Sequence, residues 1–317
     1  MSASRLLSLS LFVSLSLTAC RKGDSPPASQ PSPTELRKAL KTQLKDTPSA
    51  DEDPAPTPPP GVFEKVMYPA PLGANVAFVT PVREGAKRPA VLWLQGGFYW
   101  GIDDSGWTPA SRDNDQSARA FREAGLVLMM PALRGCNGNP GSREYFLGEV
   151  DDVLAAIDFL ARRPDVDPER IYLGGHSTGA ALALLAAASN PPVRGVLAFG
   201  PVDDVSRYGE TGTALDRVSG RELELRNPVT FMDRIRVPTL VIEGEEGNIG
   251  SFKPLRTAAR SAPVRFVSVT GATHFTVLAP VTELLARRIA EGKADADPVQ
   301  VTGHEASQAM RAGSGTP

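Results

Sequence analysis

The sequence predicts an α/β fold in which helices cover both faces of a mostly parallel, doubly wound sheet. Short apolar runs bounded by glycine or proline alternate with longer segments of helical spacing, as expected for consecutive βα units. Several of these runs are almost continuously apolar, which is typical of parallel strands buried on both faces. One run, beginning at Ile171, passes through two glycines directly into the alanine-rich segment GAALALLAAAS.

These patterns place the individual elements in chain order. The expected strands are residues 74–82, 90–94, 126–130, 171–174, 195–199, 239–243 and 264–269. The expected helices are residues 117–124, 148–162, 178–189, 252–261 and 279–291. In the second of these helices the apolar residues recur at helical spacing, and the acidic residues Asp151 and Asp152 lie near its start, where they complement the helix dipole.

The N-terminus, MSASRLLSLSLFVSLSLTAC, has the pattern of an export signal. One arginine precedes an apolar run too short to span a bilayer, and small residues follow it. The ending LTAC resembles the bacterial lipobox, so we expect a signal peptide at residues 1–19 and a lipid on Cys20. This predicts an exported lipoprotein, anchored to a membrane on the periplasmic or cell-surface side. The alternative is an ordinary secretory signal that contains a cysteine.

The rest of the chain divides into a tether, one folded domain and a tail. Residues 20–60 are rich in proline and serine around a short charged segment, TELRKALKTQLKD, and are expected to form a disordered tether. Residues 61–291 hold all the expected strands and helices, with residues 205–235 as a short lid insertion. Residues 292–317 are poor in large apolar side chains and are expected to be a disordered tail.

Composition argues against several classes of function. The net charge of -2 lacks the basic excess that a nucleic-acid surface needs. The two cysteines, Cys20 and Cys136, lie far apart in unlike contexts, so a disulfide framework is not expected. No Cys/His cluster has metal-ligand spacing. We therefore expect no nucleic-acid partner, no metal and no cofactor.

The segment Gly175-His176-Ser177-Thr178-Gly179 matches the G-x-S-x-G pattern and lies between an expected strand and an expected helix. The glycines are needed because any side chain there would collide with the neighbouring strand or helix, while the serine is pushed out at the edge of the sheet. The helix that follows points its first N–H groups at the same place, which suits an oxyanion. We expect Ser177 to be a nucleophile. The alternative is a tight turn with an incidental serine.

A serine hydroxyl is a poor nucleophile without a base, so this turn predicts a histidine later in the chain. The chain has three histidines. His176 lies inside the turn, and His304 lies in the expected tail. His274, in VSVTGATHFTVLAP, follows the last expected strand and precedes the last expected helix, where a loop can carry its imidazole back over the serine. We expect His274 to be the base; the alternative is a structural histidine that caps the helix.

Five motifs together resemble the α/β-hydrolase fold, and the core is similar to the catalytic domains of the prolyl oligopeptidase family. They are VLWLQGGF, PALRGCNGNPG, VDDVLAAIDFL, VDPERIYLGGHSTGAALAL and GATHF. The resemblance implies a serine hydrolase in which the N–H groups of Thr178 and of Gly97 or Phe98 form the oxyanion hole. Relatives usually have His-Gly-Gly in the first motif, whereas this chain has glutamine at Gln95.

The acidic member of the triad is where the sequence departs from the family. After the penultimate strand the family pattern is G-x-x-D, but the segment EGEEGN has Gly247 in place of the aspartate. Glu246 is the first choice to orient His274, because glutamate fills this role in some hydrolases. The other candidates are acids of the same turn or of the loop after the preceding strand: Glu245, Glu243, Asp203 and Asp204. A further alternative is that no carboxylate contacts the histidine.

The substrate is less well defined than the site. Peptidase relatives gain selectivity from a propeller or cap, whereas this chain offers only the short lid, which favours small esters or short peptides and amides. The aromatic residues after the glycine pair either form an apolar wall for an acyl group or pack the loop: Phe98, Tyr99, Trp100 and Trp107. The alternative function is a non-catalytic binding or scaffold lipoprotein on a degenerate hydrolase fold, suggested by Gly247 and Gln95.

Overall fold

The computed structural model describes residues 31–42, 44, 54–208, 215, 218–292 and 299–313. The expected signal peptide, the expected lipidation site Cys20 and most of the expected tether lie outside these residues. Within the described residues no helix combines the length and the apolar character needed to cross a membrane.

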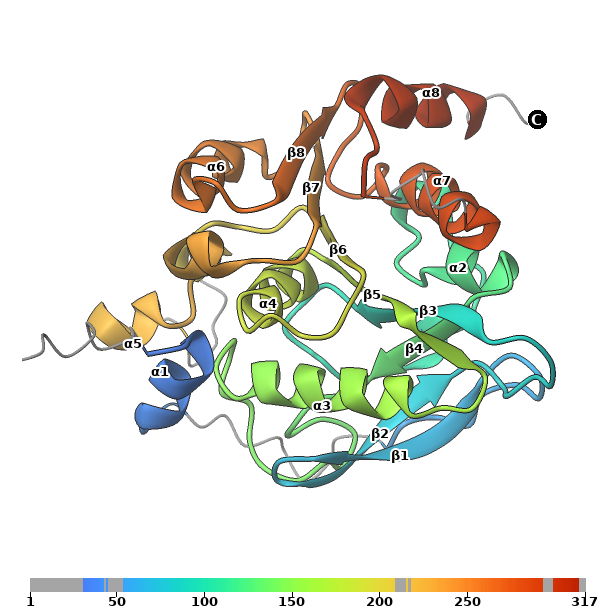
Figure 1. Cartoon of the computed structure of the whole chain (residues 1–317), viewed down its shortest axis with the longest axis horizontal. Helices are drawn as coiled ribbons and strands as arrows, with labels where there is room; N and C mark the ends of the chain where they lie inside the picture. Colours follow the sequence, from blue (N-terminus) through green and yellow to red (C-terminus); the bar gives the residue numbers. More distant parts are fainter. Residues whose placement is uncertain are drawn as a thin grey trace, which may run out of the picture. The chain divides into compact units, whose positions relative to one another are not determined.

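One eight-stranded sheet organises the domain, in the order β1-β2-β4-β3-β5-β6-β7-β8 (Figure 1). Its strands are β1 (Glu64–Ala70), β2 (Gly73–Val79), β3 (Arg88–Leu94), β4 (Val127–Pro131), β5 (Val166–His176), β6 (Gly195–Phe199), β7 (Thr239–Gly244) and β8 (Val264–Val269). β1 and β2 form an antiparallel hairpin, β2 pairs antiparallel with β4, and the other neighbours are parallel. This confirms the predicted α/β fold with a mostly parallel sheet.

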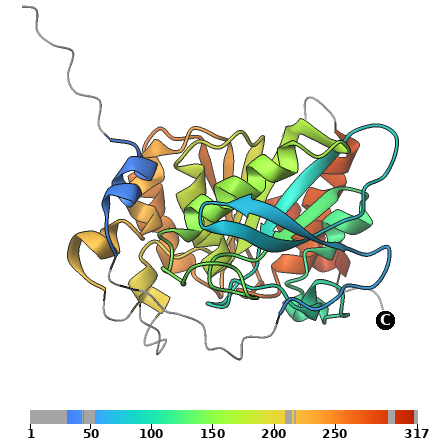
Figure 2. The same cartoon turned by 90° about the horizontal axis from the view of Figure 1, so that it is seen from below.

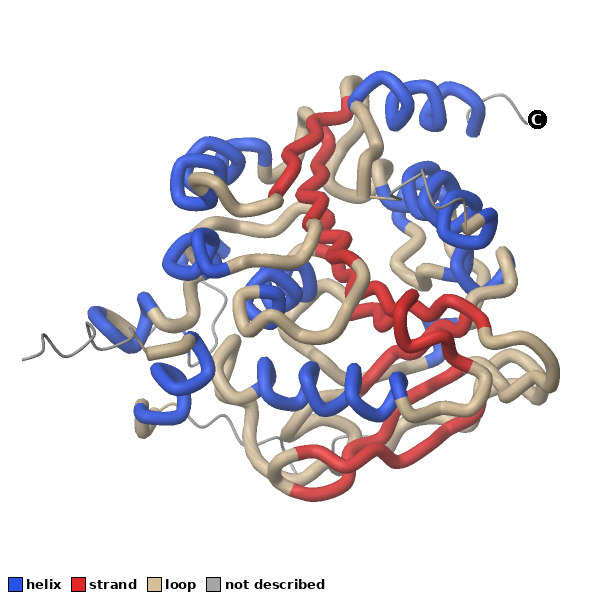
Figure 3. Tube along the Cα trace, viewed as in Figure 1, coloured by secondary structure: helices blue, strands red, loops and turns tan. Residues whose placement is uncertain are grey.

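Helices lie on both faces of this sheet. Helices α2 (Arg119–Glu123) and α7 (Leu278–Glu291) cover one face, and α3 (Glu149–Ala161), α4 (Thr178–Ala187) and α6 (Phe252–Ala259) cover the other (Figure 1). Figure 3 shows the strands as one twisted band between the two groups. Each face has its own apolar cluster. Because the strands are buried on both sides, the loops at their carboxyl ends start from fixed positions.

The edge strand of the sheet, β1, was not predicted from the sequence. Only Tyr68 is fully buried among its residues, and Met67 is 56% exposed. The strand also contains Pro69, which an edge strand tolerates because one side of its backbone needs no partner strand. Figure 2, viewed from below, shows the β1–β2 hairpin at the near edge of the sheet. A strand with so few buried side chains lacks the apolar run that identified the others.

The segment expected to be a solvated tail contains a packed helix, α8 (Gly303–Gly313). Val299, Val301 and Ala306 are buried, and the helix lies beside α7 and β8 (Figure 1). Arg288 of α7 forms an ion pair with Glu305 of α8. The expectation of a disordered tail is therefore wrong for residues 299–313. Here three apolar residues, Val299, Val301 and Ala306, belong to one of the two apolar clusters of the domain.

Part of the expected tether is also folded. Helix α1 (Pro33–Ala39) begins with a capping box in which Ser32 and Glu35 satisfy each other's backbone amides. Arg37 is buried and donates a hydrogen bond to the Ser189 hydroxyl at 2.8 Å. The expectation of a disordered tether is therefore wrong for this charged segment. The expected lid carries the short helices η3 (Val205–Tyr208), α5 (Gly220–Glu224) and η5 (Pro228–Arg234).

Candidate active site

Ser177 lies at a strained turn between the end of β5 and the start of α4. Its backbone has φ 54° and ψ −117°, a conformation that non-glycine residues rarely adopt and that costs about 1 to 3 kcal/mol. A Cβ added to Gly175 would lie 2.6 Å from the Gly179 carbonyl carbon, so the strand and the helix approach too closely for side chains. The Ser177 amide donates to the Phe199 carbonyl at 2.8 Å, which fixes the turn against β6.

The loop after β3 lies against the start of α4. The Thr178 hydroxyl donates a hydrogen bond to the Gly97 carbonyl, and Gly97 has φ +89°, a conformation that favours glycine. A Cβ on Gly96 would lie 2.9 Å from Nδ1 of His176, so this position also excludes side chains. Gln95 points elsewhere and donates to the Ser105 hydroxyl at 3.0 Å. The two glycines therefore bring the loop's backbone to the start of α4, whose first amides have no partner within the helix.

His274 and Glu243 form a directly bonded pair. His274 follows β8, and its Nδ1 lies 2.8 Å from Oε2 of Glu243, near the end of β7. The Glu243 side chain is fully buried and also accepts from the amides of Gly244 at 2.7 Å and Asn248 at 2.9 Å. With Nδ1–H directed at the carboxylate, Nε2 of His274 is the nitrogen available to exchange a proton with a nucleophile.

Glu246, the first choice for the acid, does not contact His274. Its side chain is exposed, and its amide bonds to the Ala272 carbonyl at 3.1 Å. Glu243, considered only as one of the alternatives, lies at the required place instead. The family pattern places the acid in the loop after β7, whereas the contact comes from the strand itself, where the side chain of Glu243 is buried at the carboxyl end of the sheet.

Gly247 leaves room for the carboxylate of a strand residue at the place where the family pattern expects a loop aspartate. A Cβ added to Gly247 would lie 2.6 Å from the carboxyl carbon of Glu243. The space that an aspartate side chain would need at 247 is therefore filled by the Glu243 carboxylate. The absence of a side chain at Gly247 therefore leaves space for the carboxylate of Glu243.

The remaining candidate acids are engaged elsewhere. Asp204 accepts from the amide and hydroxyl of Ser206 at 2.9 and 2.7 Å. Asp203 lies 3.4 Å from the Arg207 guanidinium, and Glu245 accepts from the Thr270 hydroxyl at 3.1 Å. Asp203 and Asp204 bond within their own loop and Glu245 bonds to Thr270 after β8, so the structure groups Glu243 alone of the named candidates with His274.

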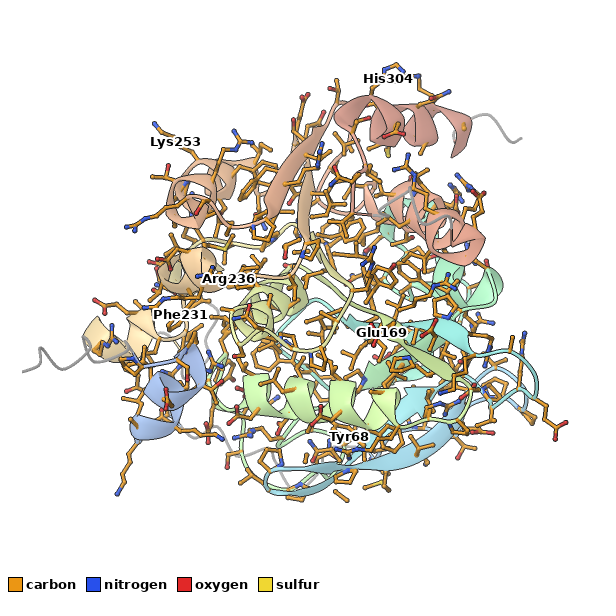
Figure 4. The ribbon with its side chains drawn as sticks, in the orientation of Figure 1. Tyr68, Glu169, Phe231, Arg236, Lys253 and His304 are labelled. Atoms are coloured by element: carbon orange, nitrogen blue, oxygen red, sulfur yellow. The ribbon has the colours of Figure 1, made fainter. Side chains whose placement is uncertain are left out.

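The other two histidines do not share the role of His274. The ring of His176 lies 4.4 Å from that of His274, and its Nε2 is 3.1 Å from the His274 carbonyl. Burial, with the nearby His274, lowers the pKa of His176 to about 3, so this ring stays neutral and supports the loop. His304 is exposed on α8, pointing away from the sheet (Figure 4).

The aromatic residues after the glycine pair separate into two groups. Phe98 and Tyr99 line an open pocket of about 450 Å³ beside the Gln95–Gly97 turn, together with residues of the loop that follows. Trp100 is buried against Tyr145 and Phe146, and Trp107 packs on Phe78 of β2. Two of the four residues therefore face a possible ligand space and two pack the loop.

Two side chains near the candidate site were not predicted from the sequence. Tyr208, in the lid segment, and Phe146, in the loop before α3, stack on each other and pack edge-on to Phe98. They meet through tertiary packing of segments more than sixty positions apart, which no local pattern records. In the described part of the chain no group of three His, Cys, Asp or Glu side chains is arranged to hold a metal ion.

Comparisons with known proteins agree with this architecture. A family model described as "Alpha/beta hydrolase family" matches residues 91–316. An uncharacterised protein of Mycobacterium tuberculosis (strain CDC 1551 / Oshkosh) is 30% identical over 191 residues, which cover 56% of this chain and 67% of that protein. The S-formylglutathione hydrolase of Rattus norvegicus is 31% identical over 148 residues, 39% of this chain and 50% of that protein.

Solved structures show the same fold. A puromycin-hydrolysing peptidase of Mycobacterium tuberculosis superposes with a TM-score of 0.59 at 17% identity. The match covers 75% of this chain but 40% of the peptidase chain, so this chain corresponds to less than half of that protein.

Proposed function

This chain belongs to the alpha/beta hydrolase family, and from that premise we propose that it is a serine hydrolase that works through an acyl-enzyme intermediate. One observation carries the proposal: a serine held at positive φ between a strand and a helix, in a fold where a histidine is bonded to a buried glutamate at 2.8 Å. Strain of this kind persists only where the surrounding structure enforces it, and it is concentrated at functional sites.

In the proposed mechanism Ser177 Oγ attacks the substrate carbonyl carbon while Nε2 of His274 takes its proton. Glu243 holds the ring by its Nδ1–H and stabilises the imidazolium that forms. The N–H groups of Thr178 and of Gly97 or Phe98 are the proposed donors to the oxyanion, because the Thr178 hydroxyl holds the glycine loop beside the helix. His274 then protonates the leaving group, and water releases the acyl group by the same steps.

The proposed substrates are small carboxylic esters or short peptides and amides. The pocket of about 450 Å³ beside the glycine loop has the size of a small-molecule site; Gly97 and Phe98 line it, whereas Ser177 and His274 do not. Among the described residues that line it are Asp103 and Asp104 and no lysine or arginine, so anionic substrates are disfavoured. The hydrolase and peptidase relatives leave ester and amide substrates both open.

A substrate panel tests this function. We expect the purified chain to hydrolyse short-chain p-nitrophenyl esters or aminoacyl p-nitroanilides, and the Ser177→Ala variant to lose at least about 1000-fold in kcat/KM. Ser189→Ala, a change outside the proposed machinery, serves as the control. Equal hydrolysis by the Ser177→Ala and wild-type proteins would exclude the mechanism. A folded wild-type protein inactive on the whole panel would favour the non-catalytic lipoprotein.

We also propose that the protein is exported and carries a lipid on Cys20, because the LTAC sequence precedes a proline-rich segment that would hold the domain away from a membrane. Incorporation of radiolabelled palmitate into the wild-type chain and its loss in Cys20→Ser are the expected results. Equal labelling of both, or of neither, would contradict the anchor.

A further inference from the structure

The hydroxyl of Tyr208 is buried beside the Ser177 hydroxyl and the Val202 amide, but it is not aligned for a hydrogen bond with either of them. Tyr208 ends η3 in the lid segment, and its Oη has no accessible surface and no aligned hydrogen bond with any described residue. Burial raises the pKa of this phenol, an effect that the Val202 amide and the Ser177 hydroxyl partly offset. The group therefore keeps its proton and can act as a hydrogen-bond donor.

The Tyr208 ring is held rigidly, so the hydroxyl cannot simply turn away. It packs edge-on to Phe98, with ring centroids 5.3 Å apart and an interplanar angle of 87°, and stacks on Phe146 at 6.0 Å and 5°. These neighbours come from the loop after β3 and the loop before α3. Buried polar groups in folded proteins are almost always paired, so a fixed and unpaired donor indicates that a ligand completes the bond.

The ring contacts also indicate on which side of Ser177 the hydroxyl lies. His274 contacts His176 and Phe275, whereas Tyr208 contacts Phe98, the residue whose amide is a proposed oxyanion donor. The phenol therefore lies on the side of Phe98, where the backbone oxyanion donors are proposed, whereas the histidine packs against His176 and Phe275.

We propose that Tyr208 is a catalytic residue that donates a hydrogen bond from Oη to the substrate oxygen as it becomes an oxyanion. It is a third donor beside the backbone amides of Thr178 and of Gly97 or Phe98. The phenol keeps its proton throughout, since His274 performs the proton transfers. This role rests on the proposed serine hydrolase and adds a donor that comes from η3 (Val205–Tyr208).

The test compares two tyrosine-to-phenylalanine changes in the full chain. Tyr208→Phe removes the unpaired hydroxyl and leaves the packed ring. Tyr68→Phe is the matched control, because the Tyr68 hydroxyl is buried on β1 beneath α3 and donates to the Ala132 carbonyl at 2.9 Å (Figure 4). The measurements are kcat and KM on a p-nitrophenyl ester, the inhibition constant of a trifluoromethyl ketone that forms a tetrahedral adduct, and the Tm.

We expect Tyr208→Phe to lower kcat by about 10- to 100-fold with KM within about twofold of wild type. The trifluoromethyl ketone should bind more weakly by a similar factor, because its adduct carries the same oxyanion. The Tm should be unchanged or higher, since no bond within the protein is lost. Tyr68→Phe should show the opposite pattern, with a lower Tm and unchanged kinetics.

Unchanged kcat and inhibitor binding in Tyr208→Phe would overturn the proposal, and so would a change confined to KM. A lowered Tm together with lowered activity would also contradict it, because the hydroxyl would then be structural. The wild-type protein separates this failure from failure of the proposed function. Ser177-dependent ester hydrolysis by wild type supports that function whatever Tyr208→Phe does, and its absence removes both proposals.

Discussion

The catalytic pair can be tested at a single carboxylate. Glu243→Gln keeps the size of the side chain but removes the charge that stabilises the imidazolium of His274, so we expect kcat/KM to fall by about 100- to 10,000-fold. Glu246→Gln, three residues further along the chain in an exposed position, should leave kcat/KM unchanged. Steady-state kinetics on one ester decide between them, and a larger loss in Glu246→Gln than in Glu243→Gln would contradict the assignment.

A second test moves the acidic side chain from position 243 to position 247, where the family pattern places it. The structure shows that the Glu243 carboxylate fills the space beside Gly247. Shortening Glu243 to alanine should inactivate the enzyme, and adding Gly247→Asp to that variant should restore at least about 10-fold in kcat/KM. In wild type the same Gly247→Asp change should be destructive, because two carboxylates would compete for one site. Loss of activity without recovery in the double variant would contradict the exchange.

The serine and the histidine could be proposed from the sequence because local rules define their positions. Ser177 lies in a turn whose glycines are required by close backbone approach, and His274 is the histidine that lies between β8 and α7. The acid was misplaced because its position depends on which side chain of β7 and its loop points inward. Tyr208 was missed because its partners come from distant segments.

At the scale of elements, the contact between the loop after β3 and α4 depends on one hydroxyl. Thr178 is buried and donates to the Gly97 carbonyl. Thr178→Val has nearly the same shape without the donor, so the loop after β3, which carries the proposed oxyanion donor, loses this hydrogen bond. We expect kcat to fall by about 10-fold in Thr178→Val, while Thr178→Ser retains activity. Kinetics on an ester test this, and equal activity of the valine and serine variants would show that the bond is dispensable.

Deleting helix α8 tests whether this segment is packed on the domain or is the disordered tail that its composition had suggested. Val299 and Val301 are buried and the helix is paired to α7 through Arg288 and Glu305. Deleting residues 299–317 exposes the apolar surface beneath them, so we expect the Tm to fall by at least about 4 °C. Thermal unfolding followed by circular dichroism is the measurement. An unchanged Tm would support the disordered tail that composition had suggested.

Helix α8 and strand β1 were both missed by the sequence-based prediction, for the same physical reason. Both elements bury few side chains, so their apolar content is close to that of a loop. The central strands were predicted correctly because burial on both faces requires almost continuously apolar runs, and the helices that cover them were predicted correctly from their apolar spacing. The periphery of the fold is determined by contacts with a core that must already be formed, and these contacts are not visible in a local window.

For the whole molecule, one buried carboxylate makes stability depend on pH. Glu149, at the start of α3, is fully buried and accepts from the amides of Glu144, Tyr145 and Leu147 at 2.6, 3.0 and 3.2 Å. Burial raises the pKa of Glu149 to about 7. Between its ordinary pKa and this value the folded chain binds a proton that the unfolded chain does not, so the free energy of unfolding falls as pH rises through this range.

We therefore expect wild type to lose stability relative to Glu149→Gln between about pH 5 and pH 8, by roughly 3 kcal/mol. Arg134, Asp152 and Glu144 surround the same site, but they are present in both proteins and cancel in the comparison. Urea unfolding at the two pH values measures the difference. A difference between the two proteins that is independent of pH would contradict the titration of Glu149.

The central claim is that Ser177, His274 and Glu243 act together as a nucleophile, a base and its orienting acid. Covalent labelling by a fluorophosphonate, followed by mass analysis of the peptides, tests it most directly. The account predicts one label per chain, located on Ser177, formed rapidly in wild type and at least about 100-fold more slowly in His274→Ala and Glu243→Gln. An unlabelled folded chain, or a label on another residue, would contradict it.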